Sequence, residues 1–223
     1  MAHLATPPLS LPLPRLLGPP LALCVVLSLG FTACSPPKVD LSPKPRSYEP
    51  HEYEDVWEKW TREDKAYEDI IVNLQIAATY WSHDFCYAYA SKWADIFGMG
   101  KDHAKQFLAE LLKKKTKHHE FLLAVVTQEH TWNNFADKDT NWRLALVTDK
   151  GAEVEPLDIE LINPVTATHK TFFPQIKLFY LIYRVRFPRR VGGSPVIAPN
   201  AKYFALRVAG PKGKLSLQWT LKR

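Results

Sequence analysis

Cysteine, glycine and the common catalytic signatures are scarce in this sequence. Its 223 residues include three cysteines and nine glycines, and the glycines show no triplet period, which excludes collagen. The patterns HExxH, CxxC, GxSxG, GxGxxG and GxxxxGK[ST] are all missing. The usual zinc sites, nucleophile elbows and phosphate-binding loops therefore find no support. We expect no catalytic, cofactor-binding or metal site.

Long apolar runs are missing too, although apolar residues are plentiful. Hydrophobic residues make up 46% of the chain and charged residues 23%, which excludes an intrinsically disordered chain. The length allows one domain, or one domain with an added helical lobe. A membrane-spanning helix needs about 20 consecutive apolar residues, and no run of that length is present.

The N-terminal region has the composition of an export signal. Residues 1–33 contain one charge, Arg15, and no acid. The apolar core that follows, 21–31, has 11 residues, within the range of a secretory signal and too short to span a bilayer. We therefore predict a signal peptide over 1–33.

The residues at the end of this core carry a family resemblance. Phe31-Thr32-Ala33-Cys34 is similar to the lipobox of bacterial lipoproteins: the two small residues and the cysteine match, and Phe31 replaces the usual leucine. The resemblance implies cleavage before Cys34, acylation of its sulfur and attachment to a lipid bilayer, for which two or more acyl chains suffice. Ser35, where aspartate would retain the protein at the inner membrane, implies the outer membrane facing the periplasm.

The cysteine count agrees with an oxidising compartment. Cys24 would leave with the signal and Cys34 would carry lipid, which leaves Cys86 without an intramolecular partner. Cys86 is either a reactive thiol or a small buried apolar residue. Its aromatic neighbours favour burial.

A proline-rich segment and a helical lobe are predicted next. Residues 34–51 contain five prolines and no apolar period, which is typical of an extended tether. From residue 52 apolar residues recur at spacings of three, four or seven, which indicates helix. They are Trp57, Trp60, Tyr67, Ile71, Leu74, Ala78, Trp81 and Phe85. We predict that this face packs within residues 52–223, because an exposed apolar face of that size promotes aggregation.

Helix boundaries can be placed inside the predicted helical lobe, 52–118. Ser82 or Asp84 can cap a second helix, which ends near Gly98. A third helix is predicted over 103–117, capped by Asp102 and ending in lysines that complement its dipole. Its inward residues would be Phe107, Leu108, Leu111 and Leu112.

From residue 119 the apolar period changes to two, which indicates strands. Five to seven short strands separated by turn signals are expected in 119–223. The longest run is 176–187, in which Phe179, Leu181, Tyr183, Val185 and Phe187 would share one face. The predicted fold class is α+β: an N-terminal helical lobe followed by a C-terminal antiparallel β-sandwich (Ig-like) or a small barrel.

Charge divides unevenly along the chain. Residues 35–100 hold 12 acids and 7 bases, whereas residues 101–223 hold 11 acids and 21 bases. The basic half predicts contact with anionic lipid headgroups or envelope polymers, attraction to the acidic half, or only a solvated surface; the export signal disfavours nucleic acid. Eight cations are the candidate anionic-surface contacts. They are Lys113, Lys114, Lys115, Lys117, Arg184, Arg186, Arg189 and Arg190.

Two constellations resemble chemical sites without meeting their requirements. His118-His119-Glu120 would point its two imidazoles to opposite faces of a strand or about 100° apart on a helix, so the pair cannot easily share a metal. Trp132, beside two asparagines, is the tryptophan whose position least fits an apolar face and could stack on a sugar; a loop anchor is the alternative.

Two functional hypotheses follow. The first is a non-catalytic envelope lipoprotein that acts as a binding, scaffold or assembly component, with the lipid bilayer, anionic envelope polymers or another envelope protein as partners. The second is an enzyme acting on envelope polymers through dispersed residues between the two lobes. A junction lined by converging acids or histidines would favour the enzyme, and one filled with tryptophan and leucine would favour binding.

Overall fold

The computed structural model describes residues 36–222 of the chain. The predicted signal peptide over 1–33 and the predicted lipidation site Cys34 lie outside this range. Within 36–222, none of the helices combines the length and the apolar composition needed to cross a membrane.

The described range contains both helices and strands, as the α+β prediction requires. The helices are the 3₁₀ turns η1 (Pro50–Glu52) and η2 (His130–Trp132) and the α-helices α1 (Tyr53–Trp60), α2 (His83–Ile96), α3 (Lys101–Lys115) and α4 (Ala167–Phe172). The strands are β1 (Thr61–Glu68), β2 (Ile71–Tyr80), β3 (His118–Thr127), β4 (Arg143–Thr148), β5 (Glu153–Val154), β6 (Asp158–Leu161), β7 (Leu181–Pro188), β8 (Arg190–Val191), β9 (Ser194–Pro195), β10 (Tyr203–Gly210) and β11 (Gly213–Thr220).

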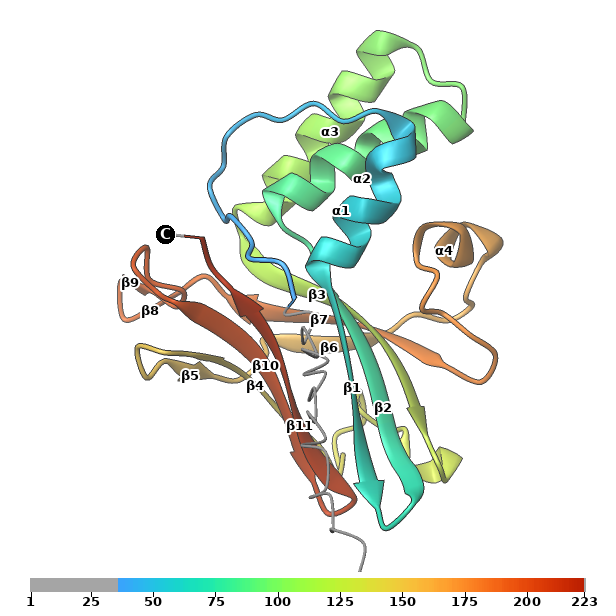
Figure 1. Ribbon diagram of the computed structural model, residues 1–223, viewed down its shortest axis with the longest axis vertical. Helices are drawn as coiled ribbons and strands as arrows, with labels where there is room; N and C mark the ends of the chain where they lie inside the picture. Colours follow the sequence, from blue (N-terminus) through green and yellow to red (C-terminus); the bar gives the residue numbers. More distant parts are fainter. Residues whose placement is uncertain (1–35, 223) are drawn as a thin grey trace, which may run out of the picture. The chain divides into compact units, whose positions relative to one another are not determined.

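All strand pairs in these sheets are antiparallel. The larger sheet has the order β1-β2-β3-β7-β6, and the second has the order β11-β10-β4-β5. β8 and β9 form a separate hairpin. Figure 1 shows helices α1, α2 and α3 grouped at one end of the strands and the two sheets spreading apart from β1 and β11. The sheets do not close into a barrel, so that alternative of the prediction is wrong.

The two sheets approach each other along β1 and β11. Arg62 on β1 donates from Nε to the carbonyl of Gln218, 2.9 Å away. The Trp219 indole donates to the carbonyl of Trp60 at 3.0 Å. At the turn before β11, a Cβ on Gly213 would lie 2.6 Å from the Cβ of Ala66, and its φ is +138°. This close approach requires glycine.

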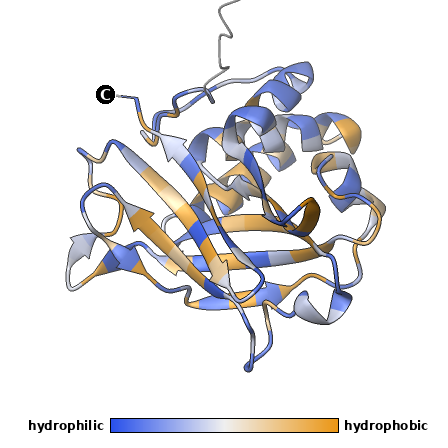
Figure 2. Ribbon diagram, turned by 60° about the horizontal axis from the view of Figure 1, so that its bottom comes forward, coloured by the Kyte–Doolittle hydropathy of each residue, from blue (hydrophilic) through white to orange (hydrophobic). Residues whose placement is uncertain are grey.

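Aromatic side chains fill the space between the sheets. Tyr80 from β2 packs on Phe204 from β10 with ring centroids 4.9 Å apart, and Phe121 from β3 packs on Trp219 at 5.4 Å. These rings are fully buried. Figure 2 shows hydrophobic residues concentrated along the strands and hydrophilic residues along much of the helices. Burial of the apolar faces of both sheets in one core favours this arrangement.

Most of the predicted strands after residue 118 are confirmed. β4, β10 and β11 lie where apolar residues alternate after residue 119, and short turns at 149–151 and 211–212 follow β4 and β10. The start of the 176–187 run is wrong. Phe179 lies in a loop with φ +69° and is 81% exposed, and regular pairing begins only at Leu181. The short helix α4 between β6 and β7 was not expected.

The prediction of helix over residues 61–80 is wrong, because this segment forms the hairpin β1–β2. On β1, burial falls on Arg62 and Ala66, a spacing of four that fits both a helix and a strand. On β2, Leu74 and Ala78 have the same spacing but belong to an alternating buried series with Ile76 and Tyr80. Tyr67 and Ile71 of the predicted helical face are 59% and 48% exposed, near the hairpin turn.

The boundary predicted at residue 119 does not divide the structure. β2, in the expected helical lobe, pairs along its length with β3, in the expected β lobe. Residues 36–222 lie within one compact unit. The aromatic residue Trp60 is fully buried in this unit, as the packing prediction requires.

The proline-rich segment is not a free tether within the described range. The amide of Val39 donates to Thr220 at 2.8 Å, and the amide of Lys222 donates to Val39 at 2.7 Å. The Val39 side chain is fully buried. The carbonyl of Pro37 accepts a hydrogen bond from Arg62. The prolines of this segment have no backbone N–H to donate. The backbone and the side chain of Val39 attach the segment to β11.

A buried charge cluster, termed the Asp84 cluster, joins this segment to the helices. It consists of Arg46, Tyr48, Lys59, Trp60 and Asp84. The Asp84 side chain is fully buried and receives Lys59 Nζ at 2.5 Å, Trp60 Nε1 at 2.9 Å, the Tyr48 hydroxyl and an ion pair from Arg46 at 2.9 Å. Burial alone would raise the pKa of this carboxyl, but these partners lower it below its ordinary value.

The helix boundaries differ from the predictions by a few residues. Ser82 caps α2, since its hydroxyl accepts from the Phe85 amide at 2.9 Å; Asp84 belongs to the cluster and is not the cap. α3 begins at Lys101 after Gly100 as N-cap, so Asp102 lies in its first turn. The three lysines of its last turn are where the dipole argument placed them.

Candidate functional site

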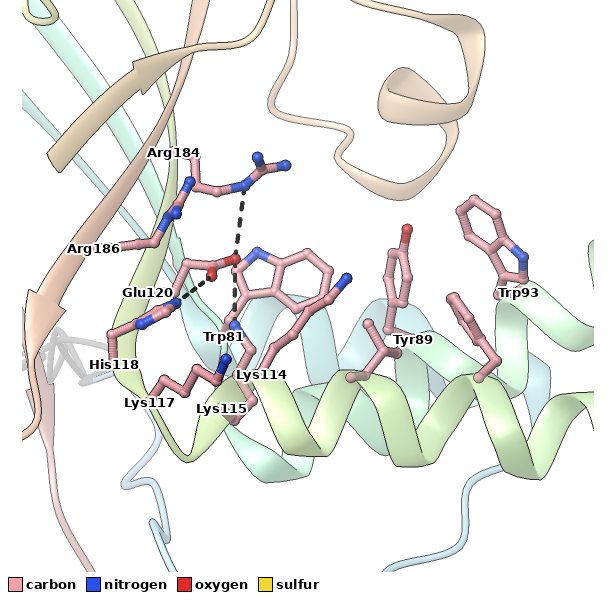
Figure 3. A pocket seen from close by; sticks show the side chains of 12 residues that line it. Trp81, Tyr89, Trp93, Lys114, Lys115, Lys117, His118, Glu120, Arg184 and Arg186 are labelled. Atoms are coloured by element: carbon pink, nitrogen blue, oxygen red, sulfur yellow. Dashed lines mark ion pairs between the residues drawn. The ribbon is translucent and has the colours of Figure 1, made fainter.

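A groove of about 440 Å³ lies where helices α2 and α3 meet strands β3 and β7. We term it the basic groove (Figure 3). Its lining combines cations from α3 and the strands with aromatic side chains from the helices. The lining residues are Trp81, Tyr89, Trp93, Phe107, Leu111, Lys114, Lys115, Lys117, His118, Glu120, Arg184 and Arg186.

Strand alternation explains the polar end of the basic groove. His118 and Glu120 are two residues apart on β3 and therefore share a face. Arg184 and Arg186 do the same on the neighbouring strand β7, where Arg186 is the register partner of Glu120. The four side chains thus lie on the same face of the larger sheet, beside the C-terminal end of α3.

Glu120 is the only acid that lines the basic groove. Its carboxylate lies 3.3 Å from Lys115 Nζ, 3.9 Å from His118 Nε2 and 3.9 Å from Arg184 Nε. Figure 3 marks these ion pairs around the carboxylate. The side chain remains 13% exposed. The contacts are longer than those of a charge-assisted hydrogen bond, so the cations surround Glu120 loosely.

Lys115 is a buried ammonium with few partners. Its side chain is 2% exposed, and its Nζ has no hydrogen bond within the described range. Apart from Glu120, the ammonium faces the Trp81 ring, whose centroid lies 4.9 Å away. Burial lowers the pKa of Lys115, and Glu120 opposes this effect. An under-coordinated buried cation is costly unless an anion can approach it.

The remaining cations differ in how far they are neutralised. Arg184 and Arg186 form ion pairs with Glu160 at 3.0 and 2.6 Å, on the neighbouring strand β6. Lys114 and Lys117 form no ion pair within residues 36–222. The basic groove therefore carries more positive charge than its neighbours balance.

A row of aromatic rings forms the other end of the basic groove. Trp81 and Tyr89 have centroids 4.9 Å apart, and Tyr89 and Trp93 are 5.6 Å apart. Phe107 of α3 packs on Trp93 at 5.3 Å, and Phe172 of α4 stacks on Trp93 at 5.1 Å. Tyr89 and Trp93 are four residues apart on α2 and therefore project from the same helix face. Figure 3 shows the charged side chains at one end and Tyr89 and Trp93 at the other.

Five of the eight predicted anionic-surface residues meet in the basic groove: Lys114, Lys115, Lys117, Arg184 and Arg186. The other three lie elsewhere. Lys113 projects from α3 into solvent. Arg190 belongs to the β8–β9 hairpin and donates from Nε to the carbonyl of Gly193 at 2.9 Å.

Arg189, the eighth candidate, lines a second cavity of about 430 Å³ on the opposite face of β3. His119 reaches this cavity and shares a hydrogen bond of 2.8 Å between its Nδ1 and the Tyr80 hydroxyl. Burial, together with the nearby charge of Arg189, lowers the pKa of His119 to about 3, so the imidazole is neutral. The predicted divergence of the two adjacent histidines is confirmed.

The remaining chemical candidates are structural within the described range. Cys86 is fully buried and unpaired, and burial raises its pKa to about 12. This confirms the interpretation of Cys86 as a small buried apolar residue. Residues 36–222 contain no cluster of three or more histidine, cysteine, aspartate or glutamate side chains arranged for a metal ion. Trp132 lies in η2, where its main-chain carbonyl accepts from the Trp142 indole at 2.6 Å and Lys212 Nζ lies 5.4 Å from the centroid of its ring.

The sequence analysis missed the aromatic row and Glu120 as parts of a site. Two signals were present: the spacing of four between Tyr89 and Trp93, and the shared parity of residues 118 and 120. Neither signal could be used without knowing that β3 pairs with β7 and that α2 and α3 pack beside that pair.

Comparisons with known proteins add little to this geometry. No protein-family model matches the chain, and no curated protein sequence is significantly similar to it. Among solved structures, a novel protein of unknown function from Burkholderia pseudomallei K96243 is similar at a TM-score of 0.39 and 10% identity, covering 79% of this chain and 93% of that chain. A likeness at that level supports no argument about fold or function.

Proposed function

We propose that the protein is a lipid-anchored component of the bacterial cell envelope whose domain binds an anionic ligand in the basic groove without transforming it. The anchor is acylated Cys34, and the location is the outer membrane facing the periplasm. The anionic ligand is either part of an envelope polymer or a smaller envelope molecule.

The observation that carries this proposal is the gathering of five cations in one groove whose lining contains a single acid. The cations come from the end of α3, from the turn after it and from β7, and α3 and β7 are about 70 residues apart in the sequence. A solvated surface would spread like charges to reduce their repulsion. Here the ammonium of Lys115 is buried among them, and the charges of Lys114 and Lys117 are not balanced by a described partner.

The scaffold supports binding better than catalysis. We propose that the two sheets act as a sandwich, which can be of the Ig-like kind, with interleaved rings such as Phe121 and Trp219 holding β3 in place. The junction of helices and strands contains mainly aromatic and basic side chains and one acid. Hydrolysis of a glycosidic bond ordinarily needs two facing carboxyl groups.

Binding can be tested with inorganic phosphate on the full chain carrying Cys34→Ala, which removes the contribution of an acyl anchor. Phosphate should raise the melting temperature of this protein as its concentration rises, because a ligand of the folded state stabilises it. The response should weaken when sodium chloride is raised from 0.1 to 1 M, since the Debye length falls from about 10 to about 3 Å.

A matched pair of variants locates the effect. The double variant Lys114→Gln/Lys117→Gln should lose most of the phosphate response, and Lys113→Gln, on the same helix end but outside the basic groove, should retain it. Equal responses in both would refute the assignment of the basic groove. Release of product from peptidoglycan fragments by the same protein would instead support the alternative of an envelope-polymer enzyme.

The anchor has its own test. The intact mass of the membrane-extracted protein should correspond to a chain that begins at Cys34 and carries acyl groups, and Cys34→Ala should leave the precursor uncleaved or released. A mature chain that begins elsewhere, or an unmodified Cys34, would contradict this part of the proposal.

A further inference from the structure

The basic groove has two chemically different ends that are continuous. Glu120 and the cations around it form one end, and Lys115 joins this end to Trp81 through its 4.9 Å contact with the ring. From Trp81 the row of rings continues to Tyr89 and Trp93 in steps of 4.9 and 5.6 Å. Figure 3 shows this succession from the charged side chains to the rings.

From this succession we infer that the ligand is a single anionic amphiphile, with a phosphate or carboxylate head joined to an acyl chain or an apolar ring. This inference rests on the proposed function and specifies its ligand. The head would lie at the Lys117 and Arg186 end, and the apolar part would lie along Trp81, Tyr89 and Trp93. A small inorganic anion would leave the row of rings unused.

The charged end is suited to a monoanionic or dianionic head. Glu120 already occupies a position among Lys115, His118 and Arg184, at 3.3 to 3.9 Å from each. Lys115 and Arg184 therefore accommodate a carboxylate beside the His118 imidazole, and Lys114 and Lys117 add charge that is not paired within the described part of the chain. A phosphate can take shorter, charge-assisted hydrogen bonds from the same donors.

The aromatic end is suited to an apolar group that is partly enclosed. Phe172 of α4 and Phe107 of α3 both pack against Trp93, so Trp93 is held in place on more than one side. Rings that are held rigidly offer apolar contact at a low cost in side-chain entropy. Because α4 covers this end, a single molecule fits better than the flat surface of a bilayer.

The experiment compares dodecyl phosphate, inorganic phosphate and neutral dodecyl maltoside by calorimetric titration of the Cys34→Ala protein, with both dodecyl compounds below their critical micelle concentrations. Each buried methylene contributes about a fourfold gain in affinity. Burial of three or four methylenes should therefore make dodecyl phosphate on the order of 100-fold tighter than inorganic phosphate. The maltoside should bind far more weakly than dodecyl phosphate.

Variants separate the two ends of the basic groove. Trp93→Ala should weaken dodecyl phosphate about tenfold and leave inorganic phosphate unchanged, whereas Lys117→Gln should weaken both. Trp132→Ala, at η2 outside the basic groove, is the matched control and should change neither. A chain-length series of ethyl, butyl and octyl phosphate on the otherwise unaltered protein needs no folded variant, and affinity should rise from ethyl to butyl phosphate and level off once three or four methylenes are buried.

The outcomes distinguish this inference from the proposed function. If affinity is the same for inorganic phosphate and for every chain length, the amphiphile is refuted and the anion site stands. If dodecyl maltoside binds as tightly as dodecyl phosphate, the charged end has no role, and both the amphiphile and the proposed anion site are refuted. If no phosphate compound binds, the amphiphile and the proposed anion site are both refuted. Full competition by phosphatidylglycerol vesicles would overturn the choice of a single free molecule.

Discussion

The Asp84 cluster and the basic groove both surround one acid with cations from separate elements, but they do so in opposite ways. Asp84 is fully buried, and Lys59, Arg46 and Trp60 approach it to between 2.5 and 2.9 Å. Glu120 is 13% exposed, and its cations stay 3.3 to 3.9 Å away. In the first case the acid satisfies its partners, and in the second it leaves them able to bind another anion.

This difference suggests a general way to tell a structural charge cluster from a binding site. Closed pairing that excludes water makes each partner indispensable, because removing one leaves a buried unpaired charge. Loose pairing beside open space costs little to disturb, and the excess charge remains available to a ligand. The predictions below test this distinction.

The largest effect is expected for Asp84→Asn. It removes the negative charge that Lys59 and Arg46 face and leaves both cations near a neutral group. Breaking a buried charge cluster typically costs about 3–5 kcal/mol of unfolding free energy. Glu120→Gln should cost less, because the Glu120 side chain is partly exposed and its contacts are longer, although the change leaves the buried ammonium of Lys115 without its acid. Urea melts followed by far-UV circular dichroism measure both, and equal losses would contradict the comparison.

A similar contrast is expected between a tryptophan of the Asp84 cluster and a tryptophan of the basic groove. Trp60 is fully buried, donates to Asp84 and accepts from Trp219 on the second sheet. Trp60→Ala should therefore cost about 3–5 kcal/mol and weaken helices and sheets together. Trp93 is only half-buried, so Trp93→Ala should cost clearly less. Coincident transitions by circular dichroism and tryptophan fluorescence would support one cooperative unit.

The isolated segment 119–223 is a control for that cooperativity. It lacks β2, the hydrogen-bonded neighbour of β3. If it unfolded at the same denaturant concentration as the full chain, the helical and β parts would be independent.

An intermediate effect is expected from pH, because the two adjacent histidines differ as the two acids do. His119 is buried with its pKa lowered from 6.5 to about 3. Below pH 6.5 this histidine is protonated in the unfolded chain, whereas in the folded chain it stays neutral until the pH approaches 3. The stability from this group is thus complete above pH 6.5 and is lost as pH falls toward 3, by at most about 1.4 kcal/mol per pH unit.

Denaturant melts between pH 7 and pH 4.5 give the test. His119→Gln should flatten the decline in unfolding free energy over this range, and His118→Gln, which alters the groove-facing imidazole, should keep most of it. If the His119→Gln profile follows the unaltered protein, the assignment of the decline to His119 is wrong.

The smallest effect is expected for an exposed ion pair that belongs to neither region. Arg143 and Glu155 lie 3.2 Å apart with side chains 62% and 68% exposed. Glu155→Gln should change the unfolding free energy by less than about 0.5 kcal/mol, because solvent screens such pairs. A loss comparable to that of Asp84→Asn would show that distance alone, without burial, determines the contribution.

Local signals alone were sufficient to predict several parts of this protein. Alternating large apolar residues located β4, β10 and β11, since these residues lie on the face of each strand that packs in the main core. Ser82 was among the two residues named as the cap of α2, and the apolar surroundings of Cys86 were correctly interpreted as burial. These features depend on residues within one turn or one strand, and nothing distant competes with them.

Other features depended on the tertiary structure. Residues 61–80 have buried positions four apart, which both periods allow, and only pairing of β2 with β3 selects the strand. Val39 looked like part of a spacer until β11 supplied its backbone partners. Eight cations were named from charge alone. Pairing of β3 with β7 and packing of the helices decided which five of them face a common groove with Glu120 and the row of rings. Contacts between distant segments leave no periodic pattern in the sequence.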